Sequence, residues 1–131
     1  YQVKEAVTGR GQWHFAPWQM PGEGEFEKLP GSLPAQPAWF RATFNVKQTP
    51  MPLFFEPRGL SKGQLYLNGH NLGRYFHATK EGTTIGPQKQ YYLPEPWLLT
   101  GQPNTLTLFD EHGRRPTNTR LAYNAQGPFG K

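Results

Sequence analysis

The chain has 131 residues, a formal charge of +5 and no cysteine. This length suits one domain and is too short for a (β/α)8 barrel, which needs about 250 residues. The lack of cysteine excludes disulfides and a thiol nucleophile, and no apolar run approaches the ~20 residues that cross a membrane. The chain begins at Tyr1 without a leader sequence, which is typical of a processed chain or an excised fragment.

The excess of basic residues raises nucleic-acid binding as one alternative. A surface that follows phosphates usually carries clustered Lys and Arg side chains. Here they are scattered along the chain, and Arg114 and Arg115 form the only adjacent pair. Nucleic acid is therefore the least favoured of the partners considered.

The first 36 residues are predicted to be irregular, apart from a short strand around Trp13 and Phe15. Residues 19–37 are rich in Pro and Gly, which indicates a long surface crossover. The alternating Glu23, Glu25 and Glu27 in this segment are expected to be solvated. Across the whole chain, 15 Gly and 14 Pro favour a fold with many turns, and hence an all-β fold.

From Pro37 onward the pattern becomes regular. In AWFRATFNV, residues 38–46, Phe40, Ala42, Phe44 and Val46 share one face, while Trp39, Arg41, Thr43 and Asn45 share the other. Further strands are predicted in PLFFE, QLYL, NLGRYF, QKQYYL, NTLTLFDE and TRLAYN. About seven or eight short strands with frequent turns indicate an antiparallel β-sandwich.

Turn signals fix the connections between these strands. Asn68-Gly69 predicts a tight hairpin, and Gly73 is expected to let the return strand pack closely. Residues 77–86 form a polar loop, and PEPWLLTG predicts one helical turn starting at its prolines. The residues expected to be buried are Phe40, Phe44, Leu65, Leu67, Leu106, Leu108 and Trp97.

Several blocks in this order resemble one known family. They are Lys62-Gly63, Asn68-Gly69, Leu72-Gly73-Arg74-Tyr75-Phe76, Gly86-Pro87-Gln88, Trp97-Leu98 and the segment 101–104. The pattern is similar to the C-terminal galactose-binding-like jelly roll of bacterial family 35 β-galactosidases, and with PAWFRATF it extends over residues 37–116. The resemblance implies a single β-sandwich domain over residues 1–131, extracellular or periplasmic, with the loop from His77 to Ile85 as a local insertion.

Catalysis is not expected from this chain. The family cleaves galactosides with two glutamates about 5 Å apart, and these lie in a barrel domain that is missing here. Asp110 and Glu111 are consecutive on a strand and should point to opposite sides. No G-x-S-x-G, HExxH or phosphate-cradling motif is present.

No cofactor is expected either. The four histidines show no metal-ligand spacing, and exposed or structural roles suit them better. The resemblance raises a structural Ca²⁺, which is common in galactose-binding-like jelly rolls. No D-x-D-x-D loop supports such a site.

The specific function that remains is carbohydrate binding by a non-catalytic module, with a plant or algal type of glycan as ligand, bound weakly. A sugar site needs an aromatic platform and converging hydrogen-bonding groups. The candidate residues are Trp13, Trp18, Trp39, Asn68, His70, Arg74, Tyr75 and His77. For three of them a structural role is an alternative, with Trp39 in the core of the second layer, Arg74 bound to Glu56 or Asp110, and Tyr75 packed against the neighbours of Phe76.

Two other interpretations stay open. The domain could be a structural accessory that braces the catalytic domain of the same polypeptide and has no sugar affinity of its own. The third reading is the basic nucleic-acid-binding β-domain considered above. A monomer is expected in each case.

Overall fold

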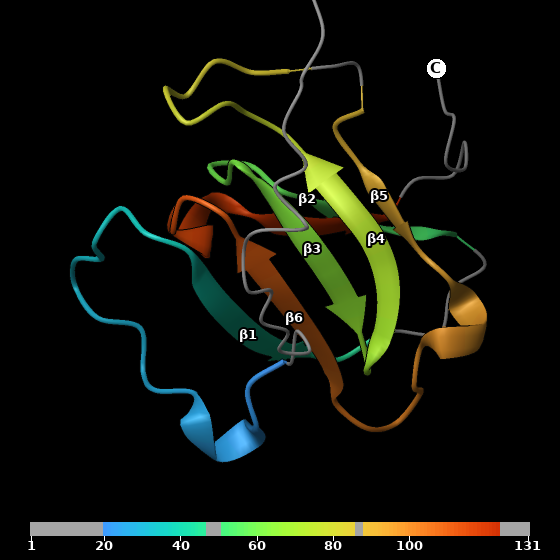
Figure 1. The fold of residues 1–131 in the computed structure, drawn as a ribbon. Coiled ribbons are helices and arrows are strands. Elements are labelled where there is room, and N and C mark those ends of the chain that lie inside the picture. The colour runs from blue at the N-terminus through green and yellow to red at the C-terminus, as the bar shows by residue number, and fades with distance from the viewer. Residues whose placement is uncertain (1–19, 47–50, 86–87, 124–131) are drawn as a thin grey trace, which may run out of the picture.

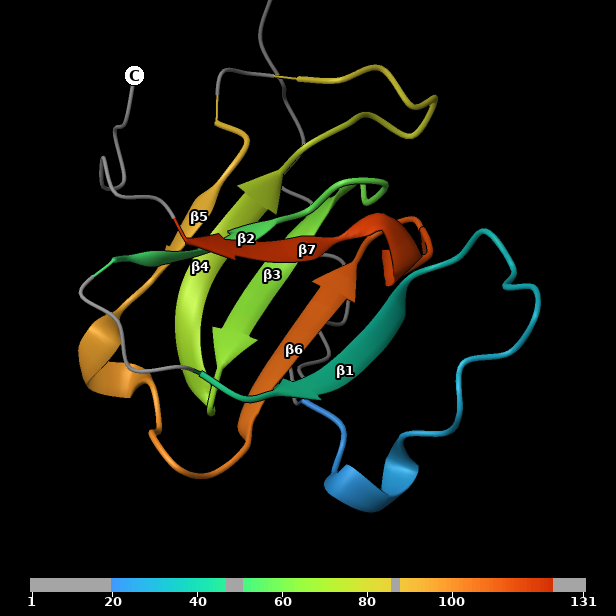
Figure 2. The same cartoon turned by 180° about the vertical axis from the view of Figure 1, so that it is seen from behind.

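The computed structural model describes residues 20–46, 51–85 and 88–123, and in them it shows two antiparallel β-sheets that face each other (Figures 1 and 2). The all-β fold class predicted from the sequence is confirmed. Sheet A runs β1 (Ala38–Phe44), β6 (Asn104–Asp110), β3 (Lys62–Leu67), β4 (His70–Phe76). Sheet B runs β5 (Tyr91–Leu93), β2 (Leu53–Glu56), β7 (Arg120–Tyr123). The predicted strand around residues 13–15 lies outside the described residues.

The described residues contain no α-helix, and their helical turns are short 3-10 turns. These are η2 (Glu23–Glu25), η3 (Glu95–Trp97) and η4 (Pro116–Asn118). The turn η3 lies where PEPWLLTG predicted one, with Pro94 preceding it and Pro96 within it. Proline suits these positions because its fixed φ matches the first residues of a helical turn.

The core forms between the two sheets from alternate residues of the strands. Strands β1 and β6 pair with Phe40 opposite Leu108, so both side chains point to the same side of sheet A. Five of the seven residues expected in the core are buried, namely Phe40, Leu65, Leu67, Leu106 and Leu108. Phe44 and Trp97 are only partly buried, although both pack against this core.

Ala42 departs from the predicted alternation. It shares the inward side with Phe40, yet it is exposed. Strand β1 is an edge strand of sheet A, and a methyl group is too small to cover the backbone around it. The inward-facing side of β1 was therefore predicted correctly, but Phe40 is the only residue of this strand that is buried.

The β3–β4 hairpin has the turn that the sequence predicted. Asn68 has φ of 49° and Gly69 of 84°, the left-handed values that Asn-Gly adopts most readily. The pairing then skips Leu72, so that Tyr66 lies opposite Asn71 and Leu65 opposite Gly73. The expected close packing at Gly73 is wrong: there is open space around it, and its φ of 101° at this bulge is what requires glycine.

The loop after β4 forms a small clasp on the upper edge of the sandwich in Figure 1. Ala78 and Thr84 pair as an isolated bridge, and the main-chain N–H of Thr79 donates to the carbonyl oxygen of Thr83 at 2.8 Å. The Arg114 guanidinium donates to the carbonyl oxygen of Lys80. The polar loop of residues 77–85 is thus a short hairpin, and Arg114, which lies after β6, is hydrogen-bonded to it.

Candidate functional site

The outer face of sheet A carries aromatic side chains at its centre. Because paired residues point to the same side, Trp39 of β1, Phe109 of β6 and Gln64 of β3 form one row across this face. The Trp39 ring lies 5.2 Å from the Phe109 ring and 5.9 Å from the Tyr66 ring, measured between centroids. Trp39 therefore belongs to this outer cluster, and the alternative that it lies in the core between the sheets is wrong.

Arg41 follows on the same face of β1 and is held by the segment that precedes the sheet. Its Nη1 lies 3.2 Å from Oε1 of Glu23 in η2, and its guanidinium carbon lies 5.0 Å from the centre of the Phe26 ring. The Arg41 side chain is 27% exposed, whereas that of Glu23 is 86% exposed. The Glu23 carboxylate is thus largely solvated, whereas the Arg41 guanidinium is also held by its contact with the Phe26 ring.

Two pockets adjoin at Arg41 and Phe26, which line both of them. One of about 290 Å³ opens towards the β3–β4 hairpin, and the other, of about 580 Å³, follows the edge of β1 past Trp39. The smaller is lined by Met20, Pro21, Glu23, Phe26, Arg41, Asn68, Gly69, Thr105 and Thr107. Figures 1 and 2 show residues 20–33, in blue, beside β1, where this segment forms one wall of both pockets.

The chemistry of these pockets suits a small polar molecule with an apolar face. Ligand pockets usually measure about 300 to 1,000 Å³, so the smaller pocket matches one sugar ring and the larger one more than a ring. Arg41 only donates hydrogen bonds and Glu23 only accepts them when ionised, so the pair can bind neighbouring hydroxyl groups from both sides. Phe26 and Trp39 supply the apolar surface on which the C–H face of a sugar stacks.

Asn68, a predicted binding residue, is instead occupied in the fold. Its Nδ2 donates to the carbonyl oxygen of Trp97 at 2.7 Å and to Oδ1 of Asn104 at 2.9 Å. Its Oδ1 accepts from the main-chain N–H of Thr105 at 2.8 Å. Asn104 is bound in turn to both main-chain groups of Leu99. The Asn68 amide therefore joins the hairpin, η3 and β6, and has no donor left for a ligand.

His70 lies next to this junction and is exposed. Its ring stacks on the Trp97 ring, with the centroids 4.5 Å apart and the planes 7° from parallel. The stack covers one side of a tryptophan that also packs against the core. His70 stays a candidate for ligand contact, but it lies on the hairpin and does not line the two pockets.

Tyr75 is fully buried and cannot contact a glycan at the surface. Its hydroxyl lies 2.8 Å from Oδ2 of Asp110 and 3.0 Å from the carbonyl oxygen of Phe109. Burial, followed by the nearby Asp110 carboxylate, raises the pKa of the Tyr75 phenol far above its usual value. The structural role that the sequence left open is the one that the geometry supports.

Asp110 is the centre of a buried polar cluster between β6 and the chain that precedes β3. It accepts five hydrogen bonds, from the N–H and hydroxyl of Ser61, the hydroxyl of Tyr75, and the main-chain N–H groups of His112 and Arg114. Because the Ser61 hydroxyl donates to Asp110, it accepts from Nδ1 of His112 at 2.9 Å. Every donor in this cluster is used within the fold, so the cluster stabilises the domain.

The remaining predicted site residues are dispersed. Arg74 binds neither Glu56 nor Asp110, as one alternative had it; its Nη2 lies 3.3 Å from Oε2 of Glu111, which directly follows β6. His77 is partly buried, and its Nδ1 has no partner among the described residues. Trp13 and Trp18 lie outside the described residues. Of the six predicted residues that the structure describes, Trp39 lines the larger pocket and Asn68 lines the smaller.

Sequence reasoning missed Arg41, Phe26 and Glu23 as site residues. The three glutamates of residues 23–27 were interpreted as solvated, and Glu23 is indeed exposed, but it also pairs with Arg41. The available signal was the outward face of β1, where Trp39 and Arg41 alternate with core residues. Their partner could not be deduced, because the path of residues 20–33 over β1 has no periodic pattern.

Other kinds of site find little support in the described part of the chain. No three His, Asp or Glu side chains lie close enough together there to hold a metal ion. None of the helical turns in those residues is long and apolar enough to cross a membrane. Glu56 is buried, but it is bound to Arg120 and Gln90.

Comparison with known proteins agrees with this architecture. The model of the family described as "Beta-galactosidase, galactose-binding domain" matches residues 37–104. The chain is 39% identical to human "Beta-galactosidase-1-like protein 2" over 90 residues and 32% identical to the "Beta-galactosidase" of Canis lupus familiaris over 107 residues. These alignments cover 69% and 76% of this chain, but only 13% and 15% of the relatives. The "Beta-galactosidase" of Mus musculus is 37% identical over 71 residues, covering 54% of this chain and 10% of the relative.

Proposed function

Because the chain belongs to the family of β-galactosidase galactose-binding domains, we propose that it is a non-catalytic accessory domain of a larger glycoside hydrolase and binds a glycan weakly. The ligand is a galactose-containing oligosaccharide or polysaccharide of plant or algal type. The domain works as a monomer within its polypeptide, in an extracellular or periplasmic setting. The catalytic domain of the same polypeptide is its second partner.

One observation carries the binding proposal: the two pockets that share Arg41 and Phe26. They combine an aromatic ring, a fixed guanidinium and carboxylates on one side of sheet A, as a sugar site requires. One stacked ring contributes about 1.5 to 3 kcal/mol of apolar burial, and each hydrogen bond about 0.5 to 1.5 kcal/mol. After the entropy lost on association, the expected dissociation constant is roughly millimolar to micromolar.

The bracing role is the second candidate, and the hairpin favours it. Asn68 and Tyr75, both expected to meet a ligand, are bound inside the domain. A domain that spans 13% to 15% of its first two relatives also has a long polypeptide to pack against. Nucleic-acid binding is the least favoured alternative, since the basic residues are scattered along the sequence, and Arg114 and Arg115, the only adjacent pair, are hydrogen-bonded to the carbonyl oxygens of Lys80 and Pro30.

The test is a calorimetric titration of galactan, xyloglucan and pectic oligosaccharides at two ionic strengths. Arg41→Ala removes the guanidinium that lines both pockets. Binding should weaken about tenfold, because the ligand loses about one charge-assisted hydrogen bond. Arg74→Ala is the matched control, since it removes an exposed arginine of the same sheet that does not line the pockets.

Four outcomes are distinguishable, the last of them in a parallel titration with DNA. Weaker binding in Arg41→Ala alone supports the pocket. Weaker binding in Arg74→Ala alone moves the site to the hairpin. Absence of binding to every glycan leaves the bracing role as the better account, and tight binding of DNA that falls steeply with salt would favour the third reading.

A further inference from the structure

Asn68-Gly69 brings together a reactive dipeptide and a structural amide. An asparagine followed by glycine is the sequence in which the next main-chain nitrogen reaches the side-chain carbonyl carbon with least obstruction, because glycine has no side chain. The nitrogen of Gly69 bonds to Cγ of Asn68, its proton leaves with Nδ2 as ammonia, and a succinimide ring forms. Water then opens the ring to aspartate or isoaspartate, without any oxidant or reductant.

We propose that Asn68 is a deamidation site that the native fold locks, and whose modification irreversibly opens the junction of the hairpin, η3 and β6. The proposal does not depend on glycan binding. It rests on the amide contacts of Asn68, on the saturation of its neighbour Asn104, and on the two-residue turn in which Asn68 stands.

Hydrogen bonds of the native fold hold both the side-chain amide and the main-chain N–H of Asn68. Ring closure requires Cγ to turn towards Gly69, which would break the contacts of Nδ2 with Trp97 at 2.7 Å and with Asn104 at 2.9 Å. It would also break the contact of Oδ1 with the N–H of Thr105 at 2.8 Å. The main-chain N–H of Asn68 is held as well, by the carbonyl oxygen of Thr105 at 2.8 Å. The reaction must therefore wait for local opening of the hairpin.

Deamidation removes the hydrogen bonds that Nδ2 of Asn68 donates, because a carboxylate has no N–H group. The carbonyl oxygen of Trp97 and Oδ1 of Asn104 would lose the hydrogen bonds that Nδ2 of Asn68 donates, and would face a negatively charged oxygen instead. Asn104 cannot turn its amide to compensate, because its Nδ2 donates to the carbonyl oxygen of Leu99 at 2.9 Å and its Oδ1 accepts from the Leu99 N–H at 2.7 Å. Isoaspartate would also lengthen the backbone of a two-residue turn and shift the pairing of β3 with β4.

The first experiment compares deamidation rates by peptide mass spectrometry at mildly alkaline pH. The folded chain and a free peptide covering residues 63–74 are incubated in the same buffer. Asn68 should react about 100-fold more slowly in the folded chain, since several hydrogen bonds must open together. A rate within about threefold of that of the free peptide would contradict the proposed protection, because the native hydrogen bonds would then not limit the reaction.

The second experiment tests the consequence with Asn68→Asp. Its unfolding equilibrium should shift by about 100-fold towards the unfolded chain, from the loss of the two part-buried hydrogen bonds that Nδ2 donates. Asn71→Asp is the matched control: it adds the same charge to the same hairpin, but Asn71 accepts a hydrogen bond from the Gly73 N–H through Oδ1, a role that aspartate keeps. If Asn68→Asp fails to fold while Asn71→Asp folds, the result supports the structural role of the Asn68 amide. Equal stability of the two variants contradicts it, whatever the rates show.

Discussion

Residue 63 lies where strands β3 and β6 leave no room for a side chain. A Cβ atom built on Gly63 would lie 1.6 Å from the carbonyl oxygen of Phe109, which is backbone and cannot turn away. We expect Gly63→Ala to destabilise the domain by about 3 kcal/mol or more, at or above the upper end for overpacked positions. Urea unfolding followed by tryptophan fluorescence measures this loss.

Gly31→Ala provides the control for that measurement. No atom lies within 4 Å of its added Cβ, so its unfolding free energy should stay within about 0.5 kcal/mol of the original chain. If both variants were equally stable, the close approach of β3 to β6 would be wrong.

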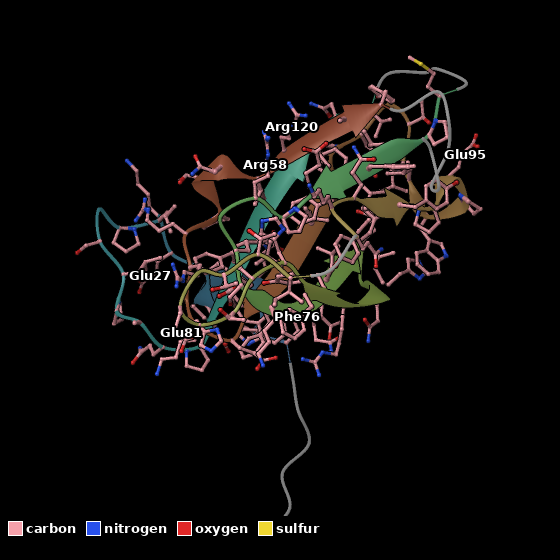
Figure 3. All side chains as sticks on the ribbon, turned by 90° about the horizontal axis from the view of Figure 1, so that it is seen from above. Glu27, Arg58, Phe76, Glu81, Glu95 and Arg120 are labelled. Carbon is pink, nitrogen blue, oxygen red and sulfur yellow. The ribbon has the colours of Figure 1, made fainter. Side chains whose placement is uncertain are left out.

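The pairing of β2 with β7 depends on an ion pair on the outer face of sheet B. Glu56 is buried although it points away from the core, because Arg120 covers it, with Nε 2.7 Å from Oε1. Arg58 lies beside Arg120 on the same side of the molecule, 3.9 Å from the same oxygen (Figure 3). The hydrogen bond from Arg120, above all, lowers the pKa of the Glu56 carboxyl below its ordinary value of 4.5.

This shift predicts a stability that depends on acid pH. A lowered carboxyl pKa contributes stability that is complete above 4.5, the value in the unfolded chain, and is lost as the pH falls through the lower folded value. Glu56→Gln should therefore cost about 1 to 2 kcal/mol near neutral pH, reduced by salt because Arg120 is largely exposed. Below that window the two proteins should converge, as unfolding titrations across the acid range would show.

Glu81→Gln controls for the loss of one carboxylate, since Glu81 is exposed in the loop of residues 77–85. Its unfolding free energy should follow that of the original chain at every pH. A pH profile of Glu56→Gln parallel to the original would exclude Glu56 as the group responsible.

Among the strands and turns, the sequence predicted those features that depend on local backbone geometry. Asn68-Gly69 gave the hairpin because its two residues alone decide the turn, and the alternation in residues 38–46 gave the outward face with Trp39 and Arg41. The bulge at Leu72 could not be predicted, because it exists only relative to β3 on the opposite side. The burial of Glu56 was equally hidden, since its partner Arg120 lies 64 residues away.

The candidate site divides in the same way. Its sheet side, with Trp39 and Arg41, was within reach of the sequence pattern. Its other wall was not, because Glu23 and Phe26 meet Arg41 only through the course of an irregular segment. Tyr75 was misplaced for the opposite reason: its motif was recognised, but the buried acceptor Asp110 lies 35 residues further on.

For the molecule as a whole, we expect no hydrolysis of galactosides. A retaining glycosidase needs two accessible carboxyl groups about 5 Å apart. The two carboxylates that are buried in the described part of the chain, Glu56 and Asp110, belong to different sheets, and each is bound by donors of the fold. Purified chain incubated with nitrophenyl galactoside should release no nitrophenol above buffer. Release that a single substitution in this chain abolishes would contradict the prediction.

The central position of β6 has a consequence for how the chain folds. Strands β1 and β3 both pair with β6, although β6 follows β4 and β5 in the sequence. During synthesis, the hairpin of β3 and β4 can form early, whereas β1 must wait with its edge unpaired until β6 has emerged. Contacts between such distant segments slow folding, and exposed strand edges attract other chains. A ribosome-bound chain that stops before residue 104 should therefore need chaperones, although most of its strands have already been made.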